Sequence, residues 1–326
     1  MVKYLPLFPS HSEYEQAKSG LEKPNVSMCQ QENEVHYNAN HDYSKDYLTF
    51  EALEDNVSIY ARDAIRSVDL VFSASTNNGA SWTEYTSTRT LPGTLIATLN
   101  QGDKLLIKGD TFGTSVGAGS CGFDSNGGEH IVYGNVMSLV HSDNFIGKTA
   151  MTKTYIDEWE EEDPETGEIV PMSEEVTNNL CFAGMFQTNE GLVSAENLIL
   201  PSTTLVENCY EYMFNSCTGL TTAPTLPATT LASNCYNDMF RNCTSLTTAP
   251  VLSATTLADW CYEGMFKDCT SLNSITCLAT DISASGCLTN WVDGVASTGT
   301  FTKAASMTSW TTSTSGIPDG WTVQNA

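Results

Sequence analysis

A 26-residue repeat dominates the C-terminal half of this 326-residue chain. The segment 200–225 returns almost unaltered as 226–251 and 252–277, a less regular copy precedes it, and a decayed copy follows. Self-similarity at such a period is typical of repeat architectures, in which each unit buries its apolar side against its neighbours. We therefore expect five units, numbered first to fifth along the chain, that stack into a solenoid with parallel strands along one face.

Each unit has an apolar pattern that predicts a short helix. In the third unit, Cys235, Tyr236, Met239, Phe240 and Cys243 fall at positions i, i+1, i+4, i+5 and i+8. This spacing predicts an amphipathic helix of about two turns, with Asn234 as its N-cap. The β-prone residues 246–250 predict a strand that ends at a proline. Stacking would align equivalent side chains in four ladders: Cys209/Cys235/Cys261, Met213/Met239/Met265, Phe214/Phe240/Phe266 and Leu220/Leu246/Leu272.

The repeat consensus, Leu-x-x-x-x-Leu-x-x-x-Cys-Tyr-x-x-Met-Phe-x-x-Cys-Thr-x-Leu-Thr-Thr-Ala-Pro, resembles the BspA-type leucine-rich repeat of surface proteins of gut Bacteroidales. The resemblance covers about residues 178–290 and implies a leucine-rich-repeat solenoid. Residues 291–326 are similar to the tail that closes such arrays. We expect these residues to form a cap, because their aromatic side chains can cover the apolar end of the last unit. Those side chains are Trp291, Phe301, Trp310 and Trp321.

Six of the eleven cysteines occupy two fixed positions in three units. This regularity favours buried thiols that pack as small apolar side chains. Disulfides, for example between Cys235 and Cys243, and metal binding are the alternatives. No Cys-x-x-Cys pair of the kind common in zinc sites occurs, and we expect neither a metal nor a cofactor.

Residues 57–150 contain short β-prone runs separated by turn signals, which predict a small antiparallel β-sandwich. The segment Asn-Asn-Gly-Ala-Ser-Trp-Thr, followed by Gln-Gly-Asp-Lys-Leu-Leu-Ile-Lys-Gly, resembles part of a β-domain that commonly precedes these repeats in proteins of the same bacterial group, the Bacteroidales. Residues 151–177 predict an acidic hairpin or linker with its tip at 164–167. Its carboxylates favour a solvated edge over a calcium site, because no Asp-x-Asp-x-Asp-Gly loop is present.

Residues 1–56 are polar and show little amphipathic periodicity. The sequences Lys-Pro-Asn-Val-Ser-x-Cys and Val-His-Tyr-Asn resemble the N-terminal segment of head and tail fibre proteins of crAss-like phages. This resemblance implies an arm that anchors the chain in a virion and supports oligomerisation. Neither a signal peptide nor a membrane-spanning stretch is evident. Fourteen Lys and Arg against 39 Asp and Glu give a net charge of −25, which opposes nucleic acid and anionic membranes as partners.

Two short motifs raise the possibility of catalysis. Residues 113–117 fit Gly-x-Ser-x-Gly, with Ser115 as the nucleophile, and residues 117–122 fit Gly-x-Gly-x-x-Gly. A nucleophile elbow needs a strand-to-helix turn and a dinucleotide site needs a βαβ unit, whereas another loop follows here. We therefore expect no enzymatic activity.

Together these features predict a mainly β chain with short helices: an arm, a β-sandwich, and a capped leucine-rich-repeat solenoid. We expect a phage virion structural protein of head-fibre or capsid-decoration type that adheres to the host surface or its glycans. A bacterial cell-surface adhesin and a tail-fibre receptor-binding protein are the alternatives. The expected state is a homotrimer that contacts other virion proteins through the arm. The candidate binding surface comprises Thr221, Thr247 and Asn273, whose hydroxyl and amide groups suit weak, multivalent contacts.

Overall fold

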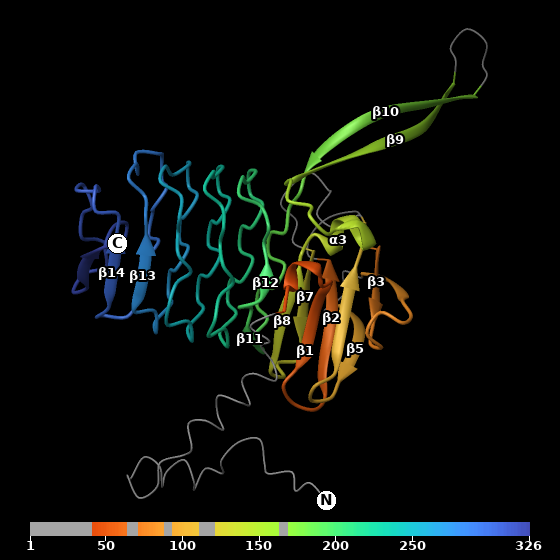
Figure 1. The fold of residues 1–326 in the computed structure, drawn as a ribbon, viewed down its shortest axis with the longest axis horizontal. Helices are drawn as coiled ribbons and strands as arrows, with labels where there is room; N and C mark the ends of the chain where they lie inside the picture. Colours follow the sequence, from red (N-terminus) through yellow and green to blue (C-terminus); the bar gives the residue numbers. More distant parts are fainter. Residues whose placement is uncertain (1–40, 64–70, 88–92, 111–120, 163–168) are drawn as a thin grey trace, which may run out of the picture. The chain divides into compact units, whose positions relative to one another are not determined.

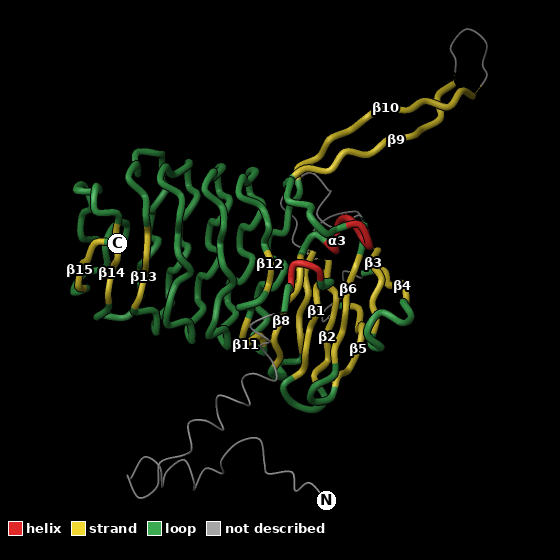
Figure 2. The backbone as a smooth tube through the Cα atoms, viewed as in Figure 1, coloured by secondary structure: helices red, strands yellow, loops and turns green. Residues whose placement is uncertain are grey.

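The computed structural model describes residues 41–63, 71–87, 93–110, 121–162 and 169–326. The chain divides into the units Met1–Asp42 and Tyr43–Ala326. Almost all of the first unit, and hence most of the predicted arm, lies outside the described residues, as do Ser115 and the predicted hairpin tip. The second unit is mainly β, with several sheets, none of them closed. Figure 1 shows its course and Figure 2 its secondary structure.

Two sheets share one core in the region before the repeats. The larger has the order β11-β8-β1-β6-β3-β4, with β12 also paired to β8, and the smaller has the order β5-β2-β7. The ring of Phe123 in the smaller sheet lies 5.5 Å from that of Phe50 and 5.9 Å from that of Phe72, both in the larger sheet. The strands of the two sheets are β1 (Leu48–Ala52), β2 (Val57–Asp63), β3 (Val71–Ser75), β4 (Thr83–Thr86), β5 (Thr94–Leu99), β6 (Lys104–Lys108), β7 (Cys121–Ser125), β8 (His130–Asn135), β11 (Leu192–Ser194) and β12 (Leu198–Ile199).

The boundary expected at residue 57 divides the larger sheet. Strand β1 was assigned to the arm from the sequence, but it pairs antiparallel with both β6 and β8, and all five of its residues are buried. Its residues Leu48, Phe50 and Ala52 belong to the core. Residues 48–52 therefore belong to the β-region and not to an arm.

A few short elements complete this part of the chain. Only one α-helix, α3 (Ser138–His141), occurs in the described residues, flanked by the 3₁₀ turn η2 (Ser142–Asn144). A second 3₁₀ turn, η1 (Tyr43–Lys45), precedes β1. Strands β9 (Thr152–Glu162) and β10 (Ile169–Asn179) pair antiparallel as a two-stranded ribbon, so the predicted acidic segment has the geometry of a hairpin over its described residues.

The repeat units lie side by side and are hydrogen-bonded to each other. The Phe214 ring stacks on Phe240 at 5.3 Å, and Phe240 on Phe266 at 5.8 Å. Isolated parallel bridges join neighbouring units, for example Thr204 to Thr230 and Thr248 to Ser274. The last strands, β13 (Ser274–Cys277), β14 (Thr300–Lys303) and β15 (Thr322–Asn325), form a parallel sheet.

The helix predicted in each unit is wrong. Figure 2 shows turns and loops, without a helix, between β12 and β13. In the second unit, the φ angles of Asn208, Tyr212 and Ser216 are 58°, 56° and 62°, a left-handed conformation that interrupts any right-handed helix. Asn234 has a φ of 54° and is one of these turn residues, not an N-cap.

Hydrogen bonding explains why the apolar pattern is misleading. Backbone N–H groups alternate between two partners: Met213 donates to Tyr210 in its own unit, whereas Phe214 donates to Met239 in the next, at 3.3 and 2.9 Å. This chain of turns repeats every four residues, with two side chains buried and two directed outward. The spacing i, i+1, i+4, i+5, i+8 fits such a ribbon as well as it fits a helix. The expected burial itself is found, since Cys235, Tyr236, Met239, Phe240 and Cys243 are all buried.

Candidate functional site

The three residues predicted as a binding surface are all exposed. The backbone N–H of Asn273 donates to the carbonyl of Thr247 at 2.9 Å, so these two residues are adjacent in neighbouring units. The hydroxyl of Thr221 donates to the carbonyl of Val193 at 2.9 Å, which uses its hydrogen within the fold. Of the three side chains, Thr221 therefore has its hydroxyl hydrogen already engaged.

A polar groove lies on a different part of the repeats, over the turn segments. It has a volume of about 550 Å³ and is open to solvent. The first unit contributes one residue, the second three, the third two and the fourth one, so the groove crosses four consecutive units. Its lining residues are Gln187, Tyr212, Asn215, Ser216, Arg241, Asn242 and Asp268.

The turn ribbon explains why these side chains converge. Tyr212 and Ser216 are left-handed residues of the second unit, and Asn242 and Asp268 are the left-handed counterparts of Ser216 in the third and fourth. Because neighbouring units are joined in register, equivalent outward positions form rows along the stack. Asn242 Nδ2 donates to the hydroxyl of Ser216 at 3.4 Å and thereby links two units across the groove.

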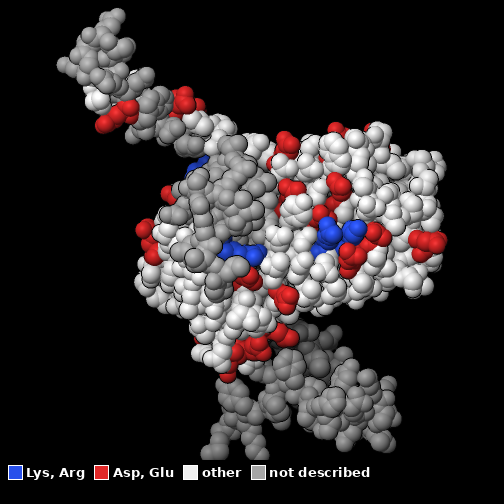
Figure 3. Space-filling model, turned by 180° about the vertical axis from the view of Figure 1, so that it is seen from behind, with Lys and Arg blue, Asp and Glu red and all other residues white. Residues whose placement is uncertain are grey.

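Basic and acidic groups are paired along the groove. Arg241 lies 3.6 Å from Asp238, and Lys267, in the equivalent position of the next unit, lies 3.2 Å from Asp293. Figure 3 shows basic side chains beside acidic ones on the repeats. Arg241 and Lys267 are the only basic residues between positions 178 and 290. This pair was not predicted from the sequence, although the two residues occupy equivalent positions in adjacent units.

Carboxylates next to the groove have altered pKa values. Burial, with the nearby charges of Asp238 and Glu263, raises the pKa of Glu211 to about 7. Burial also raises the pKa of Asp238, although Arg241 opposes the shift. Near neutral pH, therefore, Glu211 is partly protonated and able to donate as well as accept hydrogen bonds. The seven lining residues are all polar or charged and can form hydrogen bonds with a ligand.

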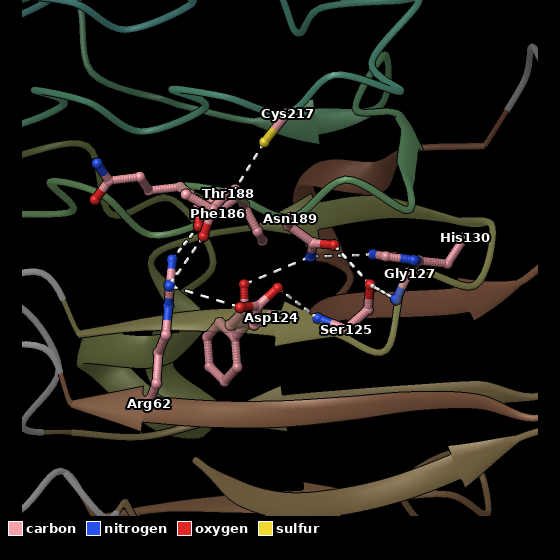
Figure 4. A network of polar contacts seen from close by, with 11 residues as sticks. Arg62, Asp124, Ser125, Gly127, His130, Phe186, Thr188, Asn189 and Cys217 are labelled. Atoms are coloured by element: carbon pink, nitrogen blue, oxygen red, sulfur yellow. Dashed lines mark hydrogen bonds and ion pairs between the residues drawn. The ribbon is translucent and has the colours of Figure 1, made fainter. Parts of the chain in front are cut away.

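A second polar cluster joins the β-region to the first repeat unit (Figure 4). Arg62 lies 3.6 Å from Asp124, donates to the hydroxyl of Thr188 at 3.1 Å, and also donates to the carbonyl of Gln187. Burial raises the pKa of Asp124, and the Arg62 charge opposes that shift. These contacts hold the start of the first unit against β2 and β7.

Asn189 is fully buried at the centre of this cluster. Its side-chain oxygen accepts from the Ser125 hydroxyl at 2.8 Å, and its Nδ2 lies 3.2 Å from His130 Nε2. His130 Nδ1 lies 2.8 Å from the Gly128 carbonyl, so Nδ1 is the donor and Nε2 accepts from Asn189. Burial lowers the pKa of His130 to about 4 and keeps the ring neutral.

The cluster contains a serine, a histidine and an aspartate, but it lacks the geometry of a nucleophilic triad. The Ser125 hydroxyl donates to Asn189, and His130 Nε2 accepts from that same amide and, within the described ranges, from no other group. A triad requires the serine hydroxyl to donate to the histidine. We assign this cluster to the packing of the first unit on the β-region.

Nine cysteines of the repeats and their flanks, including Cys235 and Cys243, are free. Three of them share one role. Cys217, Cys243 and Cys269 donate their thiols to the carbonyls of Phe186, Phe214 and Phe240 at 2.9, 3.1 and 2.9 Å. Burial raises the pKa of these thiols. Within the described part of the chain, no group of three His, Cys, Asp or Glu side chains could hold a metal ion.

Comparison with known proteins gives no relative. No family model, no curated protein and no solved structure matches this chain. Over the residues that the structure covers, no helix has the length and apolar character needed to cross a membrane.

Proposed function

We propose that this chain is a non-enzymatic phage virion structural protein of head-fibre or capsid-decoration type. Its repeats would form a leucine-rich-repeat solenoid that adheres to the host cell surface, with the β-region as a spacer and residues 1–42 as the part of the arm that docks on the virion. One observation carries the adhesive role: an open, polar groove extends across four successive units. The resemblance of the repeat to BspA-type surface proteins, and of the arm to fibre proteins of crAss-like phages, supports the setting.

Purified virions of a phage that encodes this chain provide the direct test. Mass spectrometry should detect the chain in intact particles. The alternative, a bacterial surface adhesin, predicts that the chain is absent from particles and present in the bacterial outer membrane fraction. Electron microscopy of particles carrying a label on this chain would then separate the head-fibre form from a tail-fibre receptor-binding protein.

Adhesion is tested with the purified chain carrying a fluorescent label and intact host cells. We expect saturable binding to cells that the phage infects. Oligomeric state is tested by light scattering, for which a homotrimer predicts three times the chain mass of 35.4 kDa. A monomer whose mass does not change with concentration would contradict the trimeric fibre.

A further inference from the structure

We propose that the groove over the turn segments binds an uncharged oligosaccharide laid along the stack of units. This inference rests on the proposed adhesive function and names the ligand class for it. The row of Thr221, Thr247 and Asn273 lies elsewhere on the repeats and serves as the control surface, at which we expect no oligosaccharide to bind.

The dimensions of the groove fit a chain of repeating residues. It draws its lining from four successive units, and neighbouring units are spaced by stacked rings, with Phe214 to Phe240 at 5.3 Å and Phe240 to Phe266 at 5.8 Å. One sugar residue of an extended oligosaccharide has a similar length. A ligand that runs along the stack would therefore present one residue to each unit.

The chemistry of the lining fits hydroxyl groups, which donate and accept hydrogen bonds at once. The Gln187 amide offers both functions side by side. Asn242 donates to the Ser216 hydroxyl, which in turn donates to the Asn215 side-chain oxygen at 2.9 Å. The Asn215 amide nitrogen then offers donors to a ligand, and the Asn242 side-chain oxygen offers an acceptor. The Arg241 guanidinium lies 3.6 Å from the Asp238 carboxylate, so donors and an acceptor stand together. Neighbouring hydroxyls on a sugar ring can bridge such a pair.

The lining disfavours a peptide. Protein interfaces depend on aromatic or aliphatic side chains buried in apolar pockets, whereas Tyr212 is the only aromatic residue of the groove and no aliphatic residue lines it. A single aromatic ring beside amides suits stacking against one apolar face of a sugar. Tyr212 is half-buried and reaches the groove from a left-handed turn position.

The charges disfavour an anionic ligand. Arg241 and Lys267 each have an acidic partner, Asp238 and Asp293, and Asp268 lies in the lining itself. The net charge of −25 adds long-range repulsion. An uncharged glycan avoids this penalty, whereas a uronic acid polymer would meet it at every residue.

The repeat supplies test variants whose residues already occur at equivalent positions. Arg241→Asn copies the second unit, which has Asn215 there, and Tyr212→Gly copies the fourth, which has Gly264. Asn273→Thr, which copies Thr221 and Thr247, is the control on the other row. Circular dichroism and the unfolding midpoint verify that each variant folds.

Calorimetry of the full-length chain uses four neutral probes, maltohexaose, cellohexaose, mannohexaose and xylohexaose, and one acidic probe, hexagalacturonate. We expect at least one neutral hexaose to bind. Arg241→Asn and Tyr212→Gly should each weaken binding by at least about tenfold, or about 1.4 kcal/mol, and Asn273→Thr should leave it unchanged. The proposal is overturned if no neutral hexaose binds, if hexagalacturonate binds best, or if the groove variants bind like the unaltered chain.

Cell binding separates this proposal from the proposed function. Periodate, which oxidises vicinal diols and cleaves the carbon–carbon bond between them, should abolish binding to host cells, and protease treatment of the cells should not. If protease abolishes binding and periodate does not, the partner is a protein. That result would support the adhesive function and contradict the oligosaccharide site. If the chain binds no host cell under any condition, the proposed function itself fails.

Discussion

The two ends of the repeat stack are closed in different ways. At the N-terminal end, β11 and β12 pair with β8 of the larger sheet, and side chains from both sides form a buried polar cluster around Asn189. At the C-terminal end, β14 and β15 extend the sheet from β13, and an aromatic cluster fills the space beneath them. There Trp291 lies 5.9 Å from Trp310 and 6.2 Å from Phe301.

This difference shows how one stack can have a single defined register and also be stable. A buried polar group costs free energy unless its partners are placed correctly, so the cluster at Asn189 accepts one register of the first unit. Gly191 enforces the same register, because a Cβ atom there would collide with the carbonyl of Gly128. Aromatic packing is far less directional, and it contributes mainly by removing apolar surface from water.

The largest expected effect is at the aromatic end. Trp291 is fully buried, so Trp291→Ala should lower the free energy of unfolding by about 3–5 kcal/mol, measured by guanidinium denaturation with circular dichroism. Trp260→Asn is the matched control, because Trp260 is 41% exposed and the equivalent residues are Asn208 and Asn234. It should change stability by less than about 0.5 kcal/mol. Similar losses for both variants would contradict a buried end cluster.

The polar end should respond to acid. The folded-state pKa of His130 is lowered to about 4, from an ordinary 6.5, so the unfolded chain binds more protons between these values. The contribution of His130 is thus complete above pH 6.5 and is lost as the pH falls towards 4, in total about 3 kcal/mol. The raised pKa of Glu211 acts in the opposite direction up to about pH 7.

Because the two effects overlap, the informative quantity is the difference between the unaltered chain and His130→Gln. The pH dependence of their unfolding free energies should diverge above pH 4 and become parallel above pH 6.5. Curves that stay parallel from pH 4 to 6.5 would show that His130 is not held neutral in the folded state.

Substitutions by leucine should show that the polar cluster at the N-terminal end tolerates an apolar side chain less well than the apolar core does. Asn189→Leu keeps the branching and the number of side-chain heavy atoms but leaves Ser125 and His130 without their partner, and we expect the free energy of unfolding to fall by about 2 kcal/mol. Met265→Leu, a volume-conserving change in the fully buried core of the fourth unit, should cost less than about 1.5 kcal/mol. Urea denaturation measures both. An Asn189→Leu chain as stable as the original would show that the polar cluster does not fix the register of the first unit.

The smallest expected effect concerns Trp310. Its buried Nε1 has no hydrogen-bond partner among the described residues, so Trp310→Phe removes an unsatisfied donor while keeping a ring. We expect a change within about 1 kcal/mol in either direction, measured as a shift in the unfolding midpoint. A loss as large as that of Trp291→Ala would mean that this nitrogen has a partner after all.

The sequence predicted those features that depend on local pattern. The mainly β class is confirmed, and two of the β-prone runs expected within residues 57–150 are the strands β5 (Thr94–Leu99) and β6 (Lys104–Lys108). The buried positions of each unit were also predicted, because burial follows from the recurrence of apolar residues whatever the backbone does. Their conformation was not, since the same spacing suits a helix and a ribbon of turns.

Features that depend on distant pairing were missed. Nothing in residues 48–52 indicates that they lie between β6 and β8, and nothing near Leu192 indicates a parallel pairing with His130. The groove was missed for the same reason. Its residues converge only when the register between units is known, whereas the exposed row of Thr221, Thr247 and Asn273 follows directly from the period.

The stacked ribbon of turns depends on hydrogen bonds between units, which replace those of a helix. Through-hydrogen-bond scalar coupling, measured by NMR on deuterated chain, identifies the carbonyl that accepts from each backbone N–H. We predict coupling between the amide nitrogen of Phe214 and the carbonyl carbon of Met239, whose oxygen lies 2.9 Å away. Coupling to Tyr210, four residues earlier as in an α-helix, would contradict the stacked ribbon of turns and the groove built on it.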